Sequence, residues 1–227
     1  SSSVTAPDSI ALSADITDAP CFGQSGGSIS VTAQGGTAPY TYQWSGGLPA
    51  DSQVDELPAG VYELQVVDVA GCQGSGSFTV GQPDSLQVAF TSSAASCFNT
   101  RDGALEAVVQ GGTEPYSLSW SNGASTAEIT ELAPGFYQLT VTDAQLCTLV
   151  AETQVGSPPA VDGDVEATPT RCSDTRDGII FAMGTGGTPP FTYSLQGGPF
   201  SVNSTFPGLD DGLYELIIQD ANGCEFL

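Results

Sequence analysis

Apolar and polar residues alternate in short segments along the chain. In residues 28–36, Ile29, Val31 and Ala33 are separated by polar residues, which is the period of two expected of a half-buried β-strand. Further strands are predicted at residues 40–44, 60–68 and 76–80. The segment 60–68 alternates less regularly, with Val61 grouped with two later apolar residues.

Turn residues separate these segments. The 227 residues include 28 Gly and 15 Pro. A Gly-Gly-Thr-x-Pro stretch at 35–39 ends the first strand, because glycine accepts a positive φ and proline has no N–H for a sheet. No long segment shows helical periodicity. The pattern therefore predicts an all-β protein of short strands.

One block of sequence occurs three times. Its copies begin at Cys21, Cys97 and Cys172, which follow one another at nearly equal intervals. Each copy continues with Gly-Gly, Pro-aromatic and Gly-x-Tyr steps, then an aspartate and a second cysteine. These are Asp68 and Cys72, Asp143 and Cys147, and Asp220 and Cys224.

A proline marks the start of each module. Pro7, Pro83 and Pro158 each stand at the same spacing before the first cysteine of their block. We therefore expect modules at residues 7–82, 83–157 and 158–227. Residues 1–6 match the sequence before Pro83, so we expect them to be the tail of the last strand of a preceding module, and the third module to lack its own last strand. About seven short strands per module predict tandem immunoglobulin-like β-sandwich modules.

The charge argues against several classes of partner. With 26 Asp and Glu, three Arg and no Lys, the formal net charge is −23, which repels phosphate backbones and anionic lipids. No apolar run approaches the roughly 18 residues of a transmembrane helix. We expect no nucleic-acid binding and no membrane insertion.

Six cysteines and no histidine predict disulfides in an oxidising compartment, and so a secreted protein. Two pairings are open. Pairing within modules joins Cys21 to Cys72, Cys97 to Cys147 and Cys172 to Cys224. Pairing between neighbours joins Cys21 to Cys147 and Cys97 to Cys224, and is geometrically easier if the two cysteines lie at opposite poles of a sandwich. The second arrangement would stiffen the array covalently.

Three motifs of the first block have partial counterparts at similar spacing in the other two. They are Cys-Phe-Gly-x-x-Gly-Gly-Ser-Ile at 21–29, Gly-Gly-Thr-x-Pro-Tyr-x-Tyr-x-Trp at 35–44, and Ala-Gly-Val-Tyr through Asp-Val-Ala-Gly-Cys at 59–72. Together they resemble the SprB repeat of Bacteroidota gliding-motility adhesins. The third copy departs from the pattern, with Phe191 in place of tyrosine and Leu195 in the tryptophan position.

The resemblance implies a very large cell-surface protein that is exported by type IX secretion and contributes to cell adhesion and gliding motility. Its modules would form a stalk or filament acting by reach, stiffness and surface attachment. The implied partners are neighbouring modules, other copies in a filament, and a surface polysaccharide or a solid surface.

The resemblance also suggests O-glycosylation. Bacteroidota modify Ser or Thr within an Asp-Ser/Thr-apolar sequence, to which residues 8–10 and 84–86 are similar. Sugars on Ser9 and Ser85 would then lie at the joints between modules. The alternative is a chance match of three residues.

Catalytic chemistry has few candidates. Without His or Lys, and with every cysteine in a paired position, no base is evident for a nucleophile. The acidic residues recur at equivalent positions in the copies, which suits a structural role better than a unique pair of catalytic carboxylates. We expect no enzymatic activity and no organic cofactor.

Calcium is the one ion considered, because it prefers carboxylate ligands. The candidate ligands are Asp68, Asp143 and Asp220, which follow the Gly-x-Tyr strand, with Asp102 and Asp177 in the loops after the first cysteine. The first module has no acid in that loop. The competing interpretation is that each aspartate forms a turn by binding nearby backbone N–H groups.

Two other functions remain open. Glycan-binding modules would expose Trp44 and Trp120 for stacking, whereas a core role would bury them. The chain would otherwise be a set of accessory repeats of a larger secreted enzyme, although no residue specifically supports that hypothesis.

Overall fold

The computed structural model describes residues 9–172 and 175–227. In these residues the chain forms eighteen β-strands in six antiparallel three-stranded sheets, and one short 3-10 helix. No helix among them is long and apolar enough to cross a membrane. The strand tail expected at residues 1–6 lies outside the described part of the chain.

The chain divides into two compact units. The first comprises Ser1–Val88, Val109–Ser117 and Thr140–Val150, and the second comprises Ala89–Val108, Leu118–Leu139 and Ala151–Leu227. The first repeat therefore lies in the first unit and the third repeat in the second. The middle repeat contributes to both.

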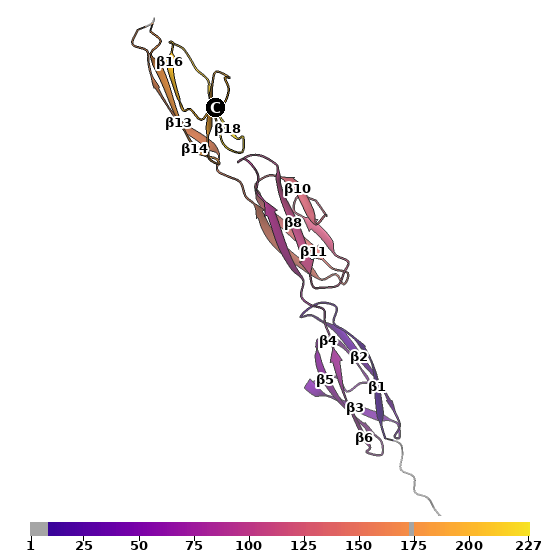
Figure 1. Ribbon diagram of the computed structural model, residues 1–227. Helices are drawn as coiled ribbons and strands as arrows, with labels where there is room; N and C mark the ends of the chain where they lie inside the picture. The colour runs from indigo at the N-terminus through magenta and orange to yellow at the C-terminus, as the bar shows by residue number, and fades with distance from the viewer. Residues whose placement is uncertain (1–8, 173–174) are drawn as a thin grey trace, which may run out of the picture. The chain divides into compact units, whose positions relative to one another are not determined.

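The first repeat contains two sheets, with the strand orders β1-β2-β4 and β3-β5-β6 (Figure 1). The strands are β1 (Ala11–Thr17), β2 (Ser25–Gln34), β3 (Tyr40–Trp44), β4 (Gln53–Pro58), β5 (Gly60–Asp68) and β6 (Gln73–Val80). The helix η1 (Ser45–Gly47) follows β3. The four strands predicted in this repeat are thus confirmed as β2, β3, β5 and β6.

Both sheets of this repeat contribute to one hydrophobic core. Ile29 on β2 and Leu64 on β5 are buried together with Trp44 at the end of β3. Along β5 the even-numbered residues face inward, so Asp68 also lies on the buried face. Val61, which the sequence pattern grouped with the inward residues, is exposed.

The other two repeats have the same sheet orders. In the middle repeat the sheets are β10-β8-β7 and β12-β11-β9, and in the third they are β13-β14-β16 and β15-β17-β18. The middle strands are β7 (Gln87–Ser93), β8 (Gly103–Gln110), β9 (Ser117–Trp120), β10 (Glu128–Leu132), β11 (Gly135–Thr142) and β12 (Thr148–Val155). The strands of the third repeat are β13 (Val161–Thr168), β14 (Gly178–Gly186), β15 (Thr192–Leu195), β16 (Thr205–Leu209), β17 (Leu216–Gln219) and β18 (Glu225–Phe226).

The sheet orders are those of strands A, B and E and strands C, F and G of an immunoglobulin fold. The all-β class with immunoglobulin-like sandwich modules is therefore confirmed. Each repeat has six strands among the described residues, where the sequence predicted about seven. In the first repeat, only residues 45–52 separate β3 from β4, and η1 occupies part of that segment, which leaves no room for a strand D between two turns.

The third repeat also differs from expectation at its end. Its last strand was expected to be missing, but the two-residue β18 pairs antiparallel with β17, in the place that β6 takes beside β5. Strand pairing resumes directly after Cys224, because the turn that holds this cysteine returns the chain to the edge of β17.

In the first two repeats, a glycine on the second strand lets the two sheets approach closely. A Cβ on Gly27 would collide with the side chain of Val80 on β6. A Cβ on Gly103 would meet Val155 of β12 in the same way. Each valine is fully buried, so it fills the space that the glycine leaves.

Candidate functional site

Each second cysteine lies in a tight turn built on an aspartate. Asp68 is the last residue of β5 and is buried. Its Oδ1 accepts a hydrogen bond from the Cys72 backbone N–H at 2.7 Å, and its Oδ2 accepts one from the Thr37 N–H at 2.8 Å. One carboxylate thus fastens the Gly-Gly-Thr turn to the turn of the cysteine.

These hydrogen bonds favour the charged form of the carboxylate. The N–H group of Thr37 is the largest cause, and it lowers the pKa of Asp68 below its ordinary value although desolvation opposes the shift. Backbone N–H groups therefore favour the anionic form of this buried aspartate.

The same turn occurs in the other repeats. In each, one carboxylate oxygen accepts from the cysteine N–H and the other from the threonine of the Gly-Gly-Thr turn. The distances are 2.8 Å from Cys147 and 2.9 Å from Thr113 to Asp143, and 2.9 Å from Cys224 and 2.8 Å from Thr188 to Asp220. We call these three segments the Asp turns: residues 68–72, 143–147 and 220–224.

The residue before each of these cysteines has a left-handed backbone. Gly71 and Gly223 have φ values of 85° and 84°, and Leu146 has 65°. Glycine adopts this conformation without a Cβ clash. Leu146 therefore holds the turn at a steric cost that the other two repeats avoid.

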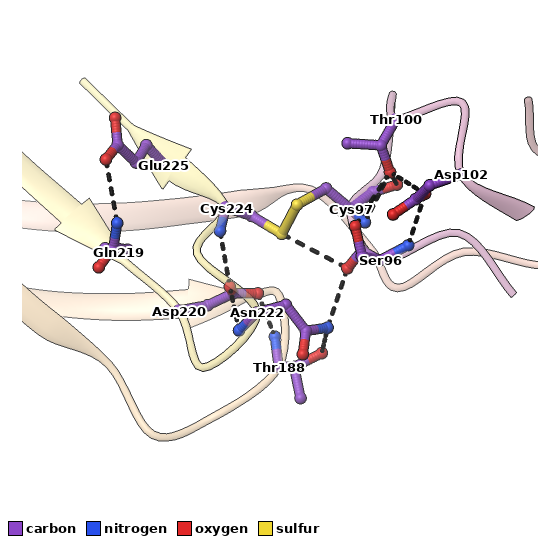
Figure 2. Close-up of a disulfide and its surroundings, with 10 residues drawn as sticks. All are labelled: Ser96, Cys97, Thr100, Asp102, Thr188, Gln219, Asp220, Asn222, Cys224 and Glu225. Carbon is purple, nitrogen blue, oxygen red and sulfur yellow. Dashed lines mark hydrogen bonds between the residues drawn. A yellow bond between two sulfur atoms is a disulfide. The ribbon is translucent and has the colours of Figure 1, made fainter. Parts of the chain in front are cut away.

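The first cysteines lie in a different turn, which we call the Cys loop: residues 20–24, residues 96–102, and residues 171–172 with 175–177. In the middle repeat, Asp102 Oδ1 accepts hydrogen bonds from the Ser96 N–H at 3.0 Å and from Thr100 Oγ1 at 2.7 Å (Figure 2). The Cys97 N–H in turn donates to Thr100 Oγ1 at 3.0 Å. The hydrogen bonds from Ser96 and then Thr100 lower the pKa of Asp102 to about 2.

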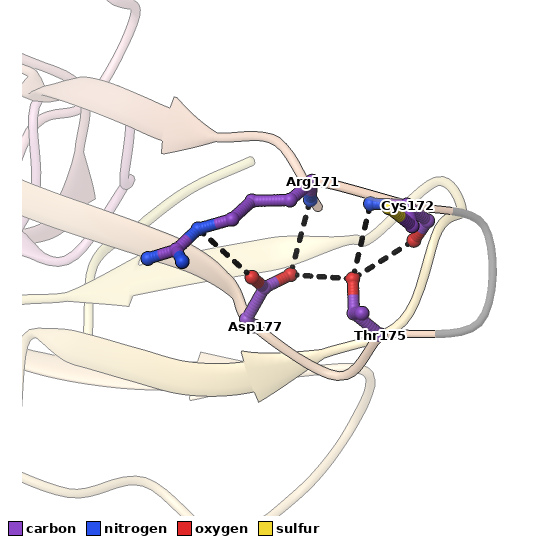
Figure 3. A network of polar contacts seen from close by, with 4 residues as sticks. All are labelled: Arg171, Cys172, Thr175 and Asp177. Atoms are coloured by element: carbon purple, nitrogen blue, oxygen red, sulfur yellow. Dashed lines mark hydrogen bonds and ion pairs between the residues drawn. The ribbon is translucent and has the colours of Figure 1, made fainter.

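The Cys loop of the third repeat repeats this network (Figure 3). Asp177 Oδ1 accepts from the Arg171 N–H at 3.1 Å and from Thr175 Oγ1 at 2.8 Å, while the Cys172 N–H donates to Thr175 Oγ1 at 3.1 Å. The Arg171 guanidinium also lies 3.3 Å from Asp177 Oδ2. The hydrogen bond from Thr175 is the main cause that lowers the pKa of Asp177.

The first repeat makes its Cys loop without an acid. The Gln24 N–H donates to the Cys21 carbonyl at 3.2 Å. The same backbone bond, three residues apart, runs from Thr100 to Cys97 at 3.3 Å and from Thr175 to Cys172 at 3.1 Å. The backbone turn is thus common to all three repeats, and the acid is an addition to it.

Two disulfides join a Cys loop to the Asp turn of the next repeat. Cys21 is bonded to Cys147 within the first unit, and Cys97 to Cys224 within the second, and in both the Cα atoms are 5.7 Å apart. This is the pairing between neighbours that the sequence left open. The pairs within modules do not occur: in the described part of the chain, Cys72 and Cys172 have no disulfide partner.

Each bridge places the incoming sulfur against the backbone of the Cys loop. Cys147 Sγ lies 3.3 Å from the Pro20 carbonyl oxygen, and Cys224 Sγ lies 3.5 Å from that of Ser96. A bonded sulfur has no proton to donate, so these are packing contacts. In the second bridge the Asn222 amide adds a hydrogen bond, from Nδ2 to the Ser96 carbonyl at 2.9 Å (Figure 2).

The candidate calcium ligands have other partners. Asp68, Asp143 and Asp220 hold the Asp turns, and Asp102 and Asp177 hold the Cys loops. Among the described residues, no three acidic or cysteine side chains gather into a metal-binding group. These contacts are those expected of the competing interpretation, in which the aspartates form turns.

The tryptophans are parts of the core. Trp44 is 8% exposed and Trp120 is 3% exposed. Their Nε1 atoms donate to the carbonyls of Asp51 and Thr126, each at 2.9 Å. The burial argues against the alternative in which these rings stack on a glycan. In the third repeat Tyr193 is buried instead.

The two candidate glycosylation serines differ in exposure. Ser9 is exposed, whereas Ser85 is half-buried. The backbone carbonyl of Ser85 lies so close to Gly111 that a Cβ there would clash with it. Asp8, the first residue of one sequon, lies outside the described residues.

Several residues that build these turns escaped the sequence analysis. They are Thr37, Thr113 and Thr188, which donate to the Asp turns, and Thr100, Thr175 and Asn222 at the Cys loops. A signal for most of them was available, because the threonine of Gly-Gly-Thr occurs in every copy and a threonine follows the first cysteine by three residues in two.

Comparison with solved structures finds similar tandem immunoglobulin-domain proteins. The eight N-terminal immunoglobulin domains of Down syndrome cell adhesion molecule align over 90% of this chain and 33% of theirs, at 15% identity and a TM-score of 0.39. Immunoglobulin domains 1–5 of Sidekick-1 align over 98% of this chain and 58% of theirs, at 10% identity and a TM-score of 0.40. The chain thus spans about a third of the first solved chain and somewhat more than half of the second.

Comparison with curated protein sequences finds no match. The family profile described as SprB repeat matches residues 13–49, 89–125 and 165–200. Each match contains the first cysteine of its repeat and the Cys loop around it. The chain therefore carries three SprB repeats, as the sequence motifs predicted.

Proposed function

We propose that the chain is a structural stalk segment of a large secreted cell-surface adhesin. The observation that carries the proposal is the pair of disulfides that join successive repeats. Disulfides persist in oxidising, extracytoplasmic environments, and the SprB repeats are consistent with an adhesin. The burial of both tryptophans supports a structural role over glycan binding.

The covalent connections limit how far such a segment extends under load. Without bridges, the whole stretch of chain from Cys21 to Cys224 bears the load. With both bridges closed, the shortest covalent path runs from Cys21 to Cys147, back along the chain to Cys97, and across to Cys224. Only the stretch between Cys97 and Cys147, about a quarter of the unbridged length, then bears the load. Unfolding of the first or third repeat therefore adds little length.

Single-molecule force spectroscopy tests this proposal on the full chain held by its ends. At about 3.5 Å per extended residue, the path between Cys21 and Cys224 should reach about 175 Å under oxidising conditions and about 700 Å after reduction. Extension of the oxidised chain to the reduced length would contradict the proposal.

Paired substitutions provide matched controls without adding free thiols. Cys21→Ser with Cys147→Ser leaves the stretch from residue 21 to Cys97 as the load-bearing path, and Cys97→Ser with Cys224→Ser leaves the stretch from Cys147 to residue 224. These two stretches are nearly equal in length. Both variants should therefore extend to about 270 Å, between the two limits.

The finer proposal is that type IX secretion exports the array and that it takes part in gliding. It follows from the family resemblance. Antibodies raised against these repeats should label intact producing cells, and the label should disappear when the secretion system is inactivated. Labelling that persists without the secretion system would contradict this part of the proposal and leave the mechanical part standing.

A further inference from the structure

In the described part of the chain, the two cysteines without a disulfide partner lie in turns of the same two kinds as the four bonded cysteines. Cys72 belongs to an Asp turn, and Cys172 belongs to a Cys loop. Each of the two disulfides joins a Cys loop to an Asp turn. The two free cysteines thus supply one Cys loop and one Asp turn, which are the two partners that such a disulfide needs.

The Asp turn at Cys72 matches the two that are bonded. Its cysteine N–H lies 2.7 Å from the aspartate Oδ1, compared with 2.8 Å at Cys147 and 2.9 Å at Cys224. The backbone bond from the aspartate N–H to the cysteine carbonyl is 3.0 Å in all three. Cys72 and Cys224 also pack in the same way against the cores of their repeats. The turn needs no rearrangement to take part in a bridge.

The Cys loop at Cys172 matches that of Cys97. Three hydrogen bonds are common to both loops. The aspartate Oδ1 accepts from the N–H of the residue before the cysteine, at 3.0 Å in the loop of Cys97 and 3.1 Å in that of Cys172, and from the threonine Oγ1, at 2.7 Å and 2.8 Å. The cysteine N–H donates to the threonine Oγ1 at 3.0 Å and 3.1 Å. Cys172 is exposed, whereas the bonded Cys97 is half-buried. The described residues of this loop thus hold the same hydrogen bonds as those around a bonded cysteine, and Cys172 itself is exposed.

We propose that Cys172 and Cys72 are the two halves of an unfilled junction, and that each forms a disulfide with a further repeat of the same kind. Cys172 would bond the cysteine of an Asp turn, and Cys72 would bond the cysteine of a Cys loop. The inference deepens the proposed function, because it names the partner through which a segment of this kind is extended covalently.

A cation lies beside Cys172. Arg171 precedes the cysteine and is one of only three cations in a chain with 26 acidic residues. Its side chain is 89% exposed. The equivalent positions in the filled junctions are Pro20 and Ser96, so a cation beside the first cysteine is particular to the third Cys loop.

The bond forms by oxidation of two thiols. The S–H bonds of Cys172 and of the partner cysteine break, their protons pass to solvent, and one S–S bond forms. The two electrons reduce a disulfide oxidant, either a thiol–disulfide oxidoreductase or glutathione disulfide, to two thiols. The oxidant is thus itself part of the proposal.

The chain supplies both halves, so it can be tested against itself. Cys72→Ser retains only the Cys loop half and Cys172→Ser only the Asp turn half, while both internal disulfides remain. In a glutathione redox buffer each variant alone should stay monomeric, and an equal mixture should form a heterodimer linked from Cys172 to Cys72. Non-reducing electrophoresis and peptide mapping by mass spectrometry measure these products.

Three results would overturn the inference. Comparable amounts of both homodimers and the heterodimer would show unselective thiol oxidation, and monomers throughout would show no junction. A wild-type monomer with a Cys72–Cys172 bond inside one chain, detected by loss of both thiols to alkylation, would show closure instead of extension. Each leaves the two internal bridges and the extension measurement unchanged, so the proposed function is tested separately.

Discussion

At the residue scale, buried aspartates organise the ends of the repeats. Asp68, Asp143 and Asp220 each accept hydrogen bonds from two segments that lie far apart in sequence. A buried carboxylate is costly unless its oxygens are hydrogen-bonded, and here backbone N–H groups meet that need. The same side chain positions the cysteine that joins the next repeat.

Removal of one of these carboxylates should loosen both turns at once. Asp143→Ala leaves the N–H groups of Thr113 and Cys147 without their acceptor, and we expect a loss of roughly 1–3 kcal/mol of unfolding free energy. Urea unfolding, with hydrogen exchange of these two amides, measures the effect. Asp164→Ala, at an exposed position on β13, is the control. Equal stability of the two variants would contradict the role of Asp143.

The lowered pKa of Asp102 predicts that the stability of the fold depends on pH in the acidic range. Its pKa is about 2 in the fold and 3.8 in the reference state. A carboxyl whose pKa is lower when folded stabilises the protein above the unfolded value, and this contribution is lost as the pH falls from about 3.8 to about 2. Thr100→Val removes one donor, so the Asp102 pKa should rise in the fold, and the loss should be smaller and should be complete at a higher pH than in wild type.

Carboxyl titration by NMR and melting temperatures between about pH 2 and 5 check this prediction. The wild-type Asp102 should titrate near 2 and the variant measurably higher. A wild-type midpoint at the ordinary value of an aspartate would show that the hydrogen bonds from Ser96 and Thr100 do not persist in solution.

At the element scale, the turn before the second cysteine depends on backbone conformation. The position requires a positive φ, which Gly71 and Gly223 supply and Leu146 adopts at 65°. Leu146 is 80% exposed, so it gains little from packing. In the middle repeat this position is therefore occupied by a residue that is less favourable for a positive φ than glycine.

Leu146→Gly should relieve this strain. A left-handed conformation costs a non-glycine residue roughly 1–2 kcal/mol, and glycine loses roughly 0.5–1 kcal/mol through chain entropy. We expect the variant to be as stable as wild type or up to about 1 kcal/mol more stable. The reciprocal Gly71→Leu should destabilise by about 1–2 kcal/mol. Denaturant unfolding of both variants gives the comparison, and a clear loss of stability in Leu146→Gly would contradict it.

At the scale of the whole molecule, the two bridges span overlapping stretches of sequence. They connect residues 126 and 127 positions apart, and each encloses residues of two repeats. Neither repeat of a bridged pair can therefore unfold and separate freely from the other. The two disulfides therefore link the three small sandwiches covalently in series.

Removal of a bridge should lower stability through the unfolded state. For loops of this length the chain-entropy model gives roughly 4–5 kcal/mol for each disulfide. We expect Cys97→Ser with Cys224→Ser to lose up to this amount in thermal or denaturant unfolding. Cys72→Ser removes a thiol and leaves both bridges, so it should match wild type.

Non-reducing peptide mapping gives the direct check of connectivity. It should recover links from Cys21 to Cys147 and from Cys97 to Cys224. Links from Cys21 to Cys72 or from Cys97 to Cys147 would instead mean repeats that are closed individually, and would remove the basis for both the extension limit and the unfilled junction.

Local features of the sequence determined the strands, the three repeats and the immunoglobulin-like class, because alternation of apolar residues and spacing of turn residues act over a few positions. Val61 shows the limit of this reasoning: its neighbours Leu64 and Val66 face inward, and only the sheet showed that Tyr62 continues their face while Val61 points to solvent.

The tertiary structure alone decided which cysteines are bonded. Sequence spacing allowed Cys21 to pair with Cys72 or with Cys147, since both of these cysteines lie in Asp turns. The choice depends on which ends of successive repeats meet, a relation between segments 126 residues apart that no local pattern records. For the same reason the sequence left the aspartates as either metal ligands or turn formers. The tertiary structure adds that each accepts a hydrogen bond from the threonine N–H of a Gly-Gly-Thr turn about 30 residues earlier in the chain.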